Sequence, residues 1–392
     1  MKRFAAQYTI TGTGEILKRA LITVDNNNVI TGVDDNGGSF RETASTPFYN
    51  GVIVPGFVNC HCHLELSWMK GKIGRRQGLP GFIREVREKR PDDRPHQIKS
   101  VRQADRGMYD SGTQACVDIC NAGYTFQIKE ESPVRYINLL EIFGIDPLKA
   151  AKRISEIIAL RKEASAFGTP YYITPHSLYS LSVPLLEKVL DMTRGNRVSS
   201  IHFMESEAEK ELLENAGGPM IDSYRAMSIT EEMLASRVRK HTDGIMELVT
   251  PSGNLILVHN TFISGSEIGE IMKRGNTYWC LCPRSNLYIE NNVPPLDLLR
   301  DANADIVIGT DSLASNDSLN MVDELYALQQ AFGDLTLADM IPWATFSGAR
   351  AAGMAGSLGT IKPGLKPGLV LIENVDLVNL KLTGQSRARR LV

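Results

Sequence analysis

Histidine and aspartate residues recur where apolar, strand-like runs of this sequence end. His61 and His63 close the first such run, His202 lies late in the fifth, and Asp311 follows the eighth. Because alternate residues of a strand point to one face, both imidazoles of the His61-x-His63 pair enter the same space. Two strand histidines alone would more simply form a hydrogen-bonded polar patch, but the later histidine and aspartate favour a metal site. Imidazole-rich sites favour Zn²⁺, with Fe²⁺ or Mn²⁺ as alternatives.

Further side chains at these strand ends could move protons. Glu205 could exchange a proton with a ring nitrogen, or it could be a surface residue that opens the acidic stretch Glu205–Glu214. His259 ends an apolar run, where orienting an attacking water is favoured over a core histidine bonded to a backbone carbonyl. Asp311 lies in a Gly-Thr-Asp-Ser segment and could equally be a turn or helix-capping residue.

Other side chains near the same ends are candidates for substrate contact. Trp68 could stack on a heterocycle, or it could pack between loops. Glu141 ends the third run, and Arg284 and Asn286 follow the seventh, so all three positions face the mouth of the expected site. Three arginines more simply form a solvated basic face than a carboxylate or phosphate site: Arg75, Arg76 and Arg84.

Eight apolar runs of strand length punctuate the sequence, and helical patterns separate most of them. The strand-like runs are Gly51–Asn59, Thr113–Cys120, Val134–Phe143, Tyr171–Pro175, Ser199–Met204, Leu255–His259, Thr277–Cys282 and Asp305–Ile308. Examples of the helical patterns are Lys152–Phe167, Pro184–Thr193, Glu231–Val249, Ile268–Arg274 and Met321–Phe332. Such alternation indicates an α/β fold with a parallel sheet buried on both faces, and eight units indicate a (β/α)8 TIM barrel. The active sites of these barrels lie at the carboxyl ends of the strands.

The two ends of the sequence have a different pattern from the middle. Residues 1–55 read as short strands with turns, and residues 353–392 are punctuated by Gly and Pro around the strand Leu369–Ile372. We expect these two segments to form one small β-sandwich domain. Residues 56–352 would then form the barrel.

Bulk properties restrict the class of protein. The net charge of −2 argues against a nucleic-acid partner. The sequence has no apolar run of about 20 residues and no signal-like start, so we expect a cytoplasmic protein without a membrane partner. A homo-oligomer is compatible with these properties. The six cysteines fall in three close pairs, which we interpret as reduced, buried thiols.

At this point the motifs resemble those of a known family. The segment Val54-Pro55-Gly56-Phe57-Val58-Asn59-x-His61-x-His63 resembles the entry motif of the amidohydrolase superfamily, and His202, His259 and Gly309-Thr310-Asp311-Ser312 continue its pattern in order. His202-x-x-Glu205, Thr174-Pro175-His176-Ser177 and Cys282-Pro283-Arg284-Ser285-Asn286 are similar to the branch that holds cytosine, guanine, adenosine-type and aminofutalosine deaminases and triazine chlorohydrolases. The acidic residue Glu65, two positions after His63 of the His-x-His pair, is similar to the residue that follows this pair in aminofutalosine deaminases.

The resemblance implies a role for each matched residue. One divalent metal, with Zn²⁺ expected, would be held by His61, His63, His202 and Asp311, because the fourth-strand lysine of two-metal members has no counterpart in Tyr171–Ser182. Asp311 would accept a proton from the attacking water, His259 would orient that water, and Glu205 would protonate the ring nitrogen. His176 and Glu65 would contact the substrate.

The resemblance further implies a hydrolase that deaminates a small heterocyclic molecule, with adenosine-type substrates such as aminofutalosine favoured. The alternatives are hydrolysis of a C–Cl bond or a cyclic amide, and a non-catalytic, metal-stabilised binding barrel.

Overall fold

Eight parallel strands form the centre of the computed structural model, which describes all residues except 36, 41–45, 90–92, 216 and 226–252. They make two four-stranded sheets, in the orders β6-β7-β8-β9 and β10-β11-β12-β13. A parallel bridge joins Ser177 to His202 at one seam, and another joins Cys62 to Asp311 at the other, so the strands follow one another around a ring. The strands are β6 (Phe57–Cys62), β7 (Thr113–Cys120), β8 (Arg135–Ile142), β9 (Tyr171–Pro175), β10 (Val198–Phe203), β11 (Asn254–His259), β12 (Thr277–Leu281) and β13 (Asp305–Ile308).

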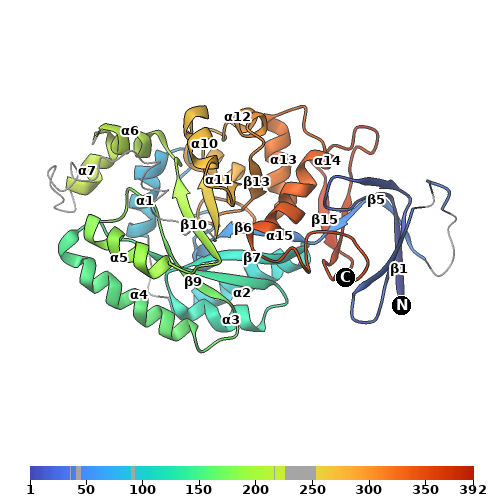
Figure 1. Ribbon diagram of the computed structural model, residues 1–392, viewed down its shortest axis with the longest axis horizontal. Coiled ribbons are helices and arrows are strands. Elements are labelled where there is room, and N and C mark those ends of the chain that lie inside the picture. The colour runs from blue at the N-terminus through green and yellow to red at the C-terminus, as the bar shows by residue number, and fades with distance from the viewer. Residues whose placement is uncertain (36, 41–45, 90–92, 216, 226–252) are drawn as a thin grey trace.

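Helices cover the outside of this ring (Figure 1). They are α1 (Gly78–Glu88), α2 (Arg94–Asp110), α3 (Phe126–Glu131), α4 (Ala150–Ala164), α5 (Val183–Thr193), α6 (Glu207–Asn215), α7 (Pro219–Arg225), α10 (Gly265–Met272), α11 (Pro283–Ile289), α12 (Leu296–Asp301), α13 (Met321–Ala331), α14 (Leu337–Pro342) and α15 (Gly348–Ala351). The described residues also form short helical turns: η1 (Leu64–Met69), η2 (Gly123–Thr125), η3 (Pro147–Lys149) and the π-helical η4 (Trp343–Ser347).

Burial explains why the central strands read as continuous apolar runs. Every residue of β6, β7, β10 and β12 is buried, because side chains of both faces are covered, one by the interior of the ring and the other by helices. The helices carry one apolar face each; in α13, for example, Leu325 and Leu328 are buried in the main core. Polar residues therefore gather at the strand ends, where the packing is interrupted.

A second, mixed sheet lies at one end of the molecule, together with both termini (Figure 1). Its order is β15-β14-β5-β1-β3-β4, with β2 paired to β1. The C-terminal strand β14 pairs antiparallel with β5, so that Leu369 faces Pro55 and Glu373 faces Gly51. The strands are β1 (Lys2–Ile10), β2 (Ile16–Lys18), β3 (Leu21–Val24), β4 (Ile30–Asp34), β5 (Phe48–Pro55), β14 (Leu369–Glu373) and β15 (Arg387–Arg390).

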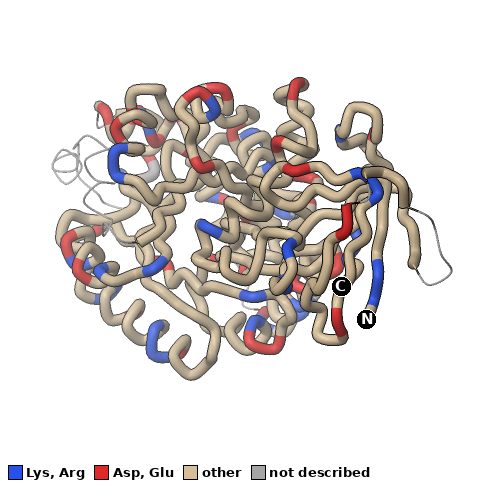
Figure 2. The backbone as a smooth tube through the Cα atoms, turned by 45° about the vertical axis from the view of Figure 1, so that its right-hand side comes forward, with Lys and Arg blue, Asp and Glu red and all other residues tan. Residues whose placement is uncertain are grey.

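The mixed α/β architecture predicted from the sequence is confirmed. The predicted strands coincide with the observed ones within a few residues, except that the first predicted run, Gly51–Asn59, spans the junction of β5 and β6. The predicted helix Glu231–Val249 lies outside the described residues. The described part of the chain has no helix that combines the length and apolarity needed to cross a bilayer. Figure 2 shows basic and acidic residues interspersed along the chain.

Candidate active site

Four histidines and an aspartate converge at the carboxyl ends of the ring strands. His61 lies near the end of β6 and His63 directly after it, His202 lies in β10, His259 ends β11, and Asp311 follows β13. The Nε2 atoms of His63 and His202 are 3.3 Å apart, and Asp311 Oδ1 lies 3.7 Å from Nε2 of both His61 and His63. One potential ligand atom each of His61, His63 and Asp311 lies within 4.8 Å of the others, and the same holds for His61, His202 and His259.

The chemistry of these donors fits a divalent metal. Both ring nitrogens of His61 and Nε2 of His259 are buried without a hydrogen-bond partner among the described residues. Buried polar atoms in proteins almost always have a hydrogen-bond partner. Buried imidazole nitrogens without one can instead coordinate a cation. Burial, reinforced by the neighbouring histidines, lowers the pKa of His63 to about 3 and holds the pKa of His202 well below its usual range. The imidazoles of His63 and His202 are therefore neutral at pH 7, as metal coordination requires.

Asp311 is oriented by two hydroxyl groups. Ser285 Oγ donates to Asp311 Oδ2 over 2.5 Å, and Ser315 Oγ donates to the same oxygen over 2.8 Å. Oδ1 is thereby left facing His61 and His63. Burial would raise the pKa of Asp311, but the adjacent histidines outweigh it and hold that pKa well below its usual range. Asp311 is thus an anion fixed in one orientation.

The backbone around the cluster is held in an uncommon conformation. His259 has a φ of 77° and Asp311 a φ of 56°, both in the left-handed region that non-glycine residues seldom occupy. Asn286 supports His259, because its Nδ2 donates to Thr261 Oγ1 over 2.5 Å and lies 3.4 Å from His259 Nδ1. Strain of this kind persists where surrounding contacts over-determine it, and such positions concentrate at functional sites.

Glu205 lies at the edge of the same cluster and is buried. Its Oε1 is 3.7 Å from His259 Nε2. Burial, together with the charges of Asp311 and neighbouring glutamates, raises the pKa of Glu205 well above its usual range, which favours the protonated carboxyl. The alternative of an exposed glutamate in a solvated acidic stretch is therefore excluded.

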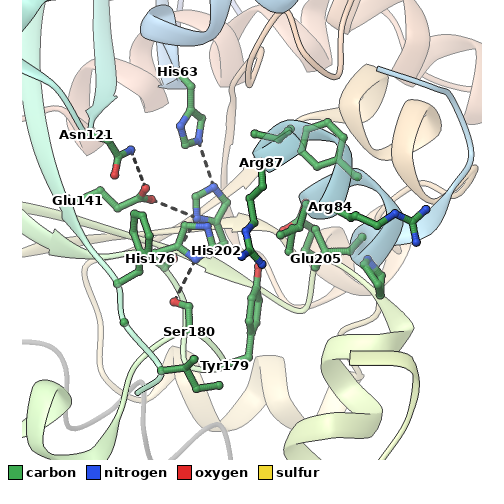
Figure 3. A pocket seen from close by; sticks show the side chains of 18 of the residues that line it. His63, Arg84, Arg87, Asn121, Glu141, His176, Tyr179, Ser180, His202 and Glu205 are labelled. Carbon is green, nitrogen blue, oxygen red and sulfur yellow. Dashed lines mark hydrogen bonds and ion pairs between the residues drawn. The ribbon is translucent and has the colours of Figure 1, made fainter. Parts of the chain in front are cut away.

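A cavity of about 710 Å³ opens onto the cluster. Its inner end is polar, and its outer walls are largely apolar, with residues of α1, of the segment after β8, and of α7. The outer apolar lining includes Leu79, Phe82, Ile83, Val86, Phe143, Ile145, Met220 and Tyr224. Four cationic side chains also line the cavity: Arg84, Arg87, Lys149 and Arg153. In the view of Figure 3, Glu141 and Asn121 lie on one side of the histidines, with Arg87 and Glu205 on the other.

Three of the residues expected to contact a substrate line this cavity. Glu141 Oε2 accepts from Asn121 Nδ2 over 2.9 Å, while its Oε1 is buried without a hydrogen-bond partner among the described residues. The ring nitrogen Nδ1 of His176 lies 3.1 Å from Ser180 Oγ. Glu65 Oε2 accepts from the backbone N–H groups of Asn121 and the next residue, so it also fixes the loop after β7.

The other three expected substrate contacts are not among the described residues that line the cavity. Trp68 is buried in a small apolar cluster with Met69 and Ile73. This packing agrees with the second role considered for Trp68, packing between loops. Arg284 lies in ion pairs with Asp317 and Asp323. Asn286 faces His259 and Thr261. Each of these three side chains is therefore engaged by the protein itself, and substrate contact at these positions stays a prediction.

Several residues of the site escaped the sequence reasoning. The α1 residues Leu79, Phe82, Ile83 and Val86 recur at helical spacing, which was the available signal for an amphipathic helix. Ser285 and Ser315 lie beside motif residues, yet nothing in their spacing indicates which hydroxyl reaches Asp311.

Comparisons with known proteins agree with this geometry. The model of the amidohydrolase family matches residues 52–391. An aminodeoxyfutalosine deaminase of Nitratiruptor sp. is 28% identical over 284 residues, covering 71% of this chain and 67% of the relative. A 5-methylthioadenosine/S-adenosylhomocysteine deaminase of Pelotomaculum thermopropionicum is 24% identical, covering 94% of this chain and 83% of the relative.

Two solved structures share the fold. The aminofutalosine deaminase of Helicobacter pylori, in complex with methylthio-coformycin, has a TM-score of 0.78 at 22% identity and covers 98% of this chain and 94% of its own. The zinc complex of an atrazine chlorohydrolase from Arthrobacter aurescens has a TM-score of 0.74 at 16% identity. The match covers 100% of this chain and 95% of the chlorohydrolase chain.

Proposed function

The chain belongs to the amidohydrolase family, and from this membership and the geometry of the cavity we propose that it is a metal-dependent hydrolase that deaminates an amino-substituted nitrogen heterocycle. Adenine-type nucleosides such as aminofutalosine are the favoured substrates. The observation that carries the proposal is the buried Glu205 carboxyl, whose Oε1 lies 3.7 Å from Nε2 of His259 at the edge of the histidine cluster. A deaminase needs this pairing, because the ring nitrogen must gain a proton as the adjacent carbon is attacked.

We assign the metal to His61, His63, His202 and Asp311. Donor atoms of His61, His63 and Asp311 lie within 4.8 Å of one another, and Nε2 of His202 lies 3.3 Å from Nε2 of His63. Zn²⁺ suits this imidazole-rich set, and related proteins of the same fold contain it. When bound, the ion would act as a Lewis acid that activates a water molecule at neutral pH.

The remaining steps belong to side chains of the chain itself. Asp311 accepts a proton from the attacking water through Oδ1, since its Oδ2 is occupied by Ser285 and Ser315. His259 holds the water through the unpaired Nε2. Glu205 donates its proton to the ring nitrogen, and the proton held by Asp311 then passes to the amino group, which leaves as ammonia. The hydroxyl proton left on the attacked carbon returns to Glu205 as the keto product forms.

The shape of the cavity supports a substrate larger than a base. A volume of about 710 Å³ is within the range of pockets for drug-sized molecules, which bury most of their ligand. Glu141 and His176 lie between the histidine cluster and the outer wall, where they would contact the sugar. The apolar α1 wall and the cationic residues favour a nucleoside whose 5′ substituent is apolar and carries an anionic group.

The proposal treats the ring of strands as a (β/α)8 TIM barrel of residues 56–352. Segments 1–55 and 353–392 are proposed to form the small β-sandwich domain. Two features support this division: the continuous order of eight parallel strands and the pairing of β14 with β5.

The proposal is tested by incubating the zinc-loaded protein with adenosine, 5′-methylthioadenosine, aminofutalosine, cytosine, guanine, a chlorotriazine and a hydantoin. We expect ammonia release and the keto product from the adenine nucleosides, and no ring opening of the hydantoin. Chloride release from the triazine, or ring opening, without ammonia from any aminated heterocycle would contradict the deaminase assignment. The double variant His61→Ala/Asp311→Ala, prepared in parallel, is the inactive control.

A further inference from the structure

An ion pair that the proposed chemistry does not use lies buried behind the site. Asp118 of β7 and Lys129 of α3 form a salt bridge, and both side chains are completely inaccessible to solvent. Lys129 Nζ also donates to Asn138 Oδ1 and to Cys120 Sγ, over 3.0 Å in each case. All three ammonium protons of Lys129 therefore have an acceptor.

The second oxygen of Asp118 reaches the strand that carries the histidine pair. Asp118 Oδ1 accepts from the backbone N–H of Leu64 over 2.8 Å, and Leu64 directly follows His63. At this point the β6–β7 ladder is irregular, because its register shifts between Asn59 and Cys62. The carboxylate thus anchors a chain segment where the regular pairing of the two strands is interrupted.

Stability alone does not explain this arrangement. Transferring two charges into the protein interior is costly, and replacing a buried ion pair by apolar residues of similar volume is often neutral or stabilising. Burial would lower the pKa of Lys129, but the adjacent Asp118 outweighs it and raises that pKa, so the Lys129 ammonium stays charged. The aromatic rings of Phe126 and Tyr136, 5.8 Å and 5.7 Å from Nζ, enclose it further.

We propose that Asp118 and Lys129 are positioning residues for metal binding. Lys129 fixes one oxygen of the Asp118 carboxylate, and the other oxygen holds the Leu64 amide, so that the turn after His63 keeps the imidazole aimed at the histidine cluster. This inference rests on the proposed function in one respect, since it takes His63 to be a metal ligand.

Two double variants separate positioning from the mere presence of charge. Asp118→Ala with Lys129→Met removes both charges and the acceptor for Leu64. Asp118→Asn with Lys129→Met removes both charges but keeps an oxygen that accepts from Leu64. The matched control is Asp105→Asn, a buried carboxylate of the neighbouring helix α2 whose partners are Ser132 and Tyr136.

Two readouts are measured on the zinc-loaded full chain. One is the rate at which a chelator removes zinc, with the absorption spectrum of the cobalt-substituted protein as a check on ligand geometry. The other is hydrogen exchange of the peptide covering residues 60–69. The alanine–methionine variant should release zinc about 10- to 100-fold faster, the usual effect of losing a group that orients a ligand, and its peptide should exchange faster. The asparagine–methionine variant should bring both the rate of zinc release and the hydrogen exchange of residues 60–69 most of the way back to the wild-type values.

The control decides whether the effect is specific. Asp105→Asn should lower the melting temperature without changing zinc release or the exchange of residues 60–69. Wild-type zinc release in both double variants, or a loss that follows the melting temperature in all three proteins, would overturn the inference. A wild-type protein that holds zinc but releases no ammonia would overturn the proposed reaction. The rates of zinc release from the variants would then still test the positioning role of Asp118 and Lys129. If the wild type holds no zinc, the proposed metal function fails, and the exchange experiment alone decides whether the pair holds the turn.

Discussion

At the scale of single residues, the protonation of Glu205 separates binding from chemistry. Glu205→Gln keeps the shape of the side chain and its burial but removes the proton that the ring nitrogen would receive. We expect turnover to fall by ~10²-fold or more, the usual scale for a lost general acid, while zinc content and KM change little. Steady-state ammonia release and elemental analysis measure the two effects.

The exposed Glu207, two residues further along the chain, is the matched control for this substitution. Glu207→Gln should turn over at the wild-type rate. If Glu205→Gln turned over equally fast, the proton route through Glu205 would be wrong, whatever the reaction.

At the scale of elements, the turn from β10 into α6 depends on a buried carboxylate. Met204 has a φ of 48°, and the backbone N–H of Glu205 donates to Glu209 Oε2 over 2.8 Å. Burial raises the pKa of Glu209 to about 8, although backbone N–H donors oppose the rise. In the unfolded chain a glutamate has a pKa of about 4.3. The folded state therefore binds a proton at pH 6 that the unfolded state has released.

This difference predicts a pH dependence of stability. Because the pKa of Glu209 is raised in the folded state, its contribution is present at low pH and is lost as the pH rises toward 8. In Glu209→Gln, which cannot ionise, the loss of unfolding free energy between pH 5 and pH 8 should shrink by about 2 kcal/mol or more. Urea unfolding at the two pH values measures it. An unchanged difference would show that Glu209 is ionised in the folded protein.

Helix α1 forms one wall of the cavity through its half-buried residues Phe82, Ile83 and Val86. Apolar side chains that face a cavity rather than the core would contact a substrate arm. Phe82→Ala with Ile83→Ala should raise KM for nucleosides with an apolar 5′ substituent by about 10-fold, since each lost apolar contact costs about 1–3 kcal/mol. The kcat for adenosine should stay near the wild-type value.

Glu88, exposed in the last turn of α1, gives the comparison for this pair of substitutions. Glu88→Ala should leave both substrates unaffected. An equal loss for adenosine and for the substituted nucleosides in the α1 variant would show that the helix supports the fold of the site and not a substrate arm.

At the scale of the whole molecule, one bound ion should connect the two halves of the ring. Its proposed ligands come from β6, β10 and the segment after β13, which belong to both four-stranded sheets. We expect about one equivalent of zinc per chain and a fall in melting temperature of roughly 5 °C or more on removing it, because a ligand that binds only the folded state stabilises it. Differential scanning calorimetry with and without chelator measures the shift.

In His61→Ala the chelator should no longer change the melting temperature. Two tightly bound equivalents by elemental analysis would contradict the single-metal assignment.

Much of the site could be predicted from local pattern. The His61-x-His63 spacing places two imidazoles on one face of a strand whatever the rest of the chain does, because the strand repeat of two residues is a local property. The alternation of buried strands with helices then predicted that the ends of distant strands would share one edge. His202, His259 and Asp311 do gather with His61 and His63 at that edge.

Only the tertiary structure decided which loop side chains face the cavity. Trp68 and Glu141 were equally plausible contacts from their positions, yet Trp68 packs into an apolar cluster while Glu141 lines the cavity, with Oε1 3.8 Å from Nδ1 of His202. Asn286 likewise serves His259 rather than the cavity. The physical reason is that a loop side chain is oriented by residues remote in sequence that compete for it, whereas strand and helix periodicities are set by backbone geometry within a few residues.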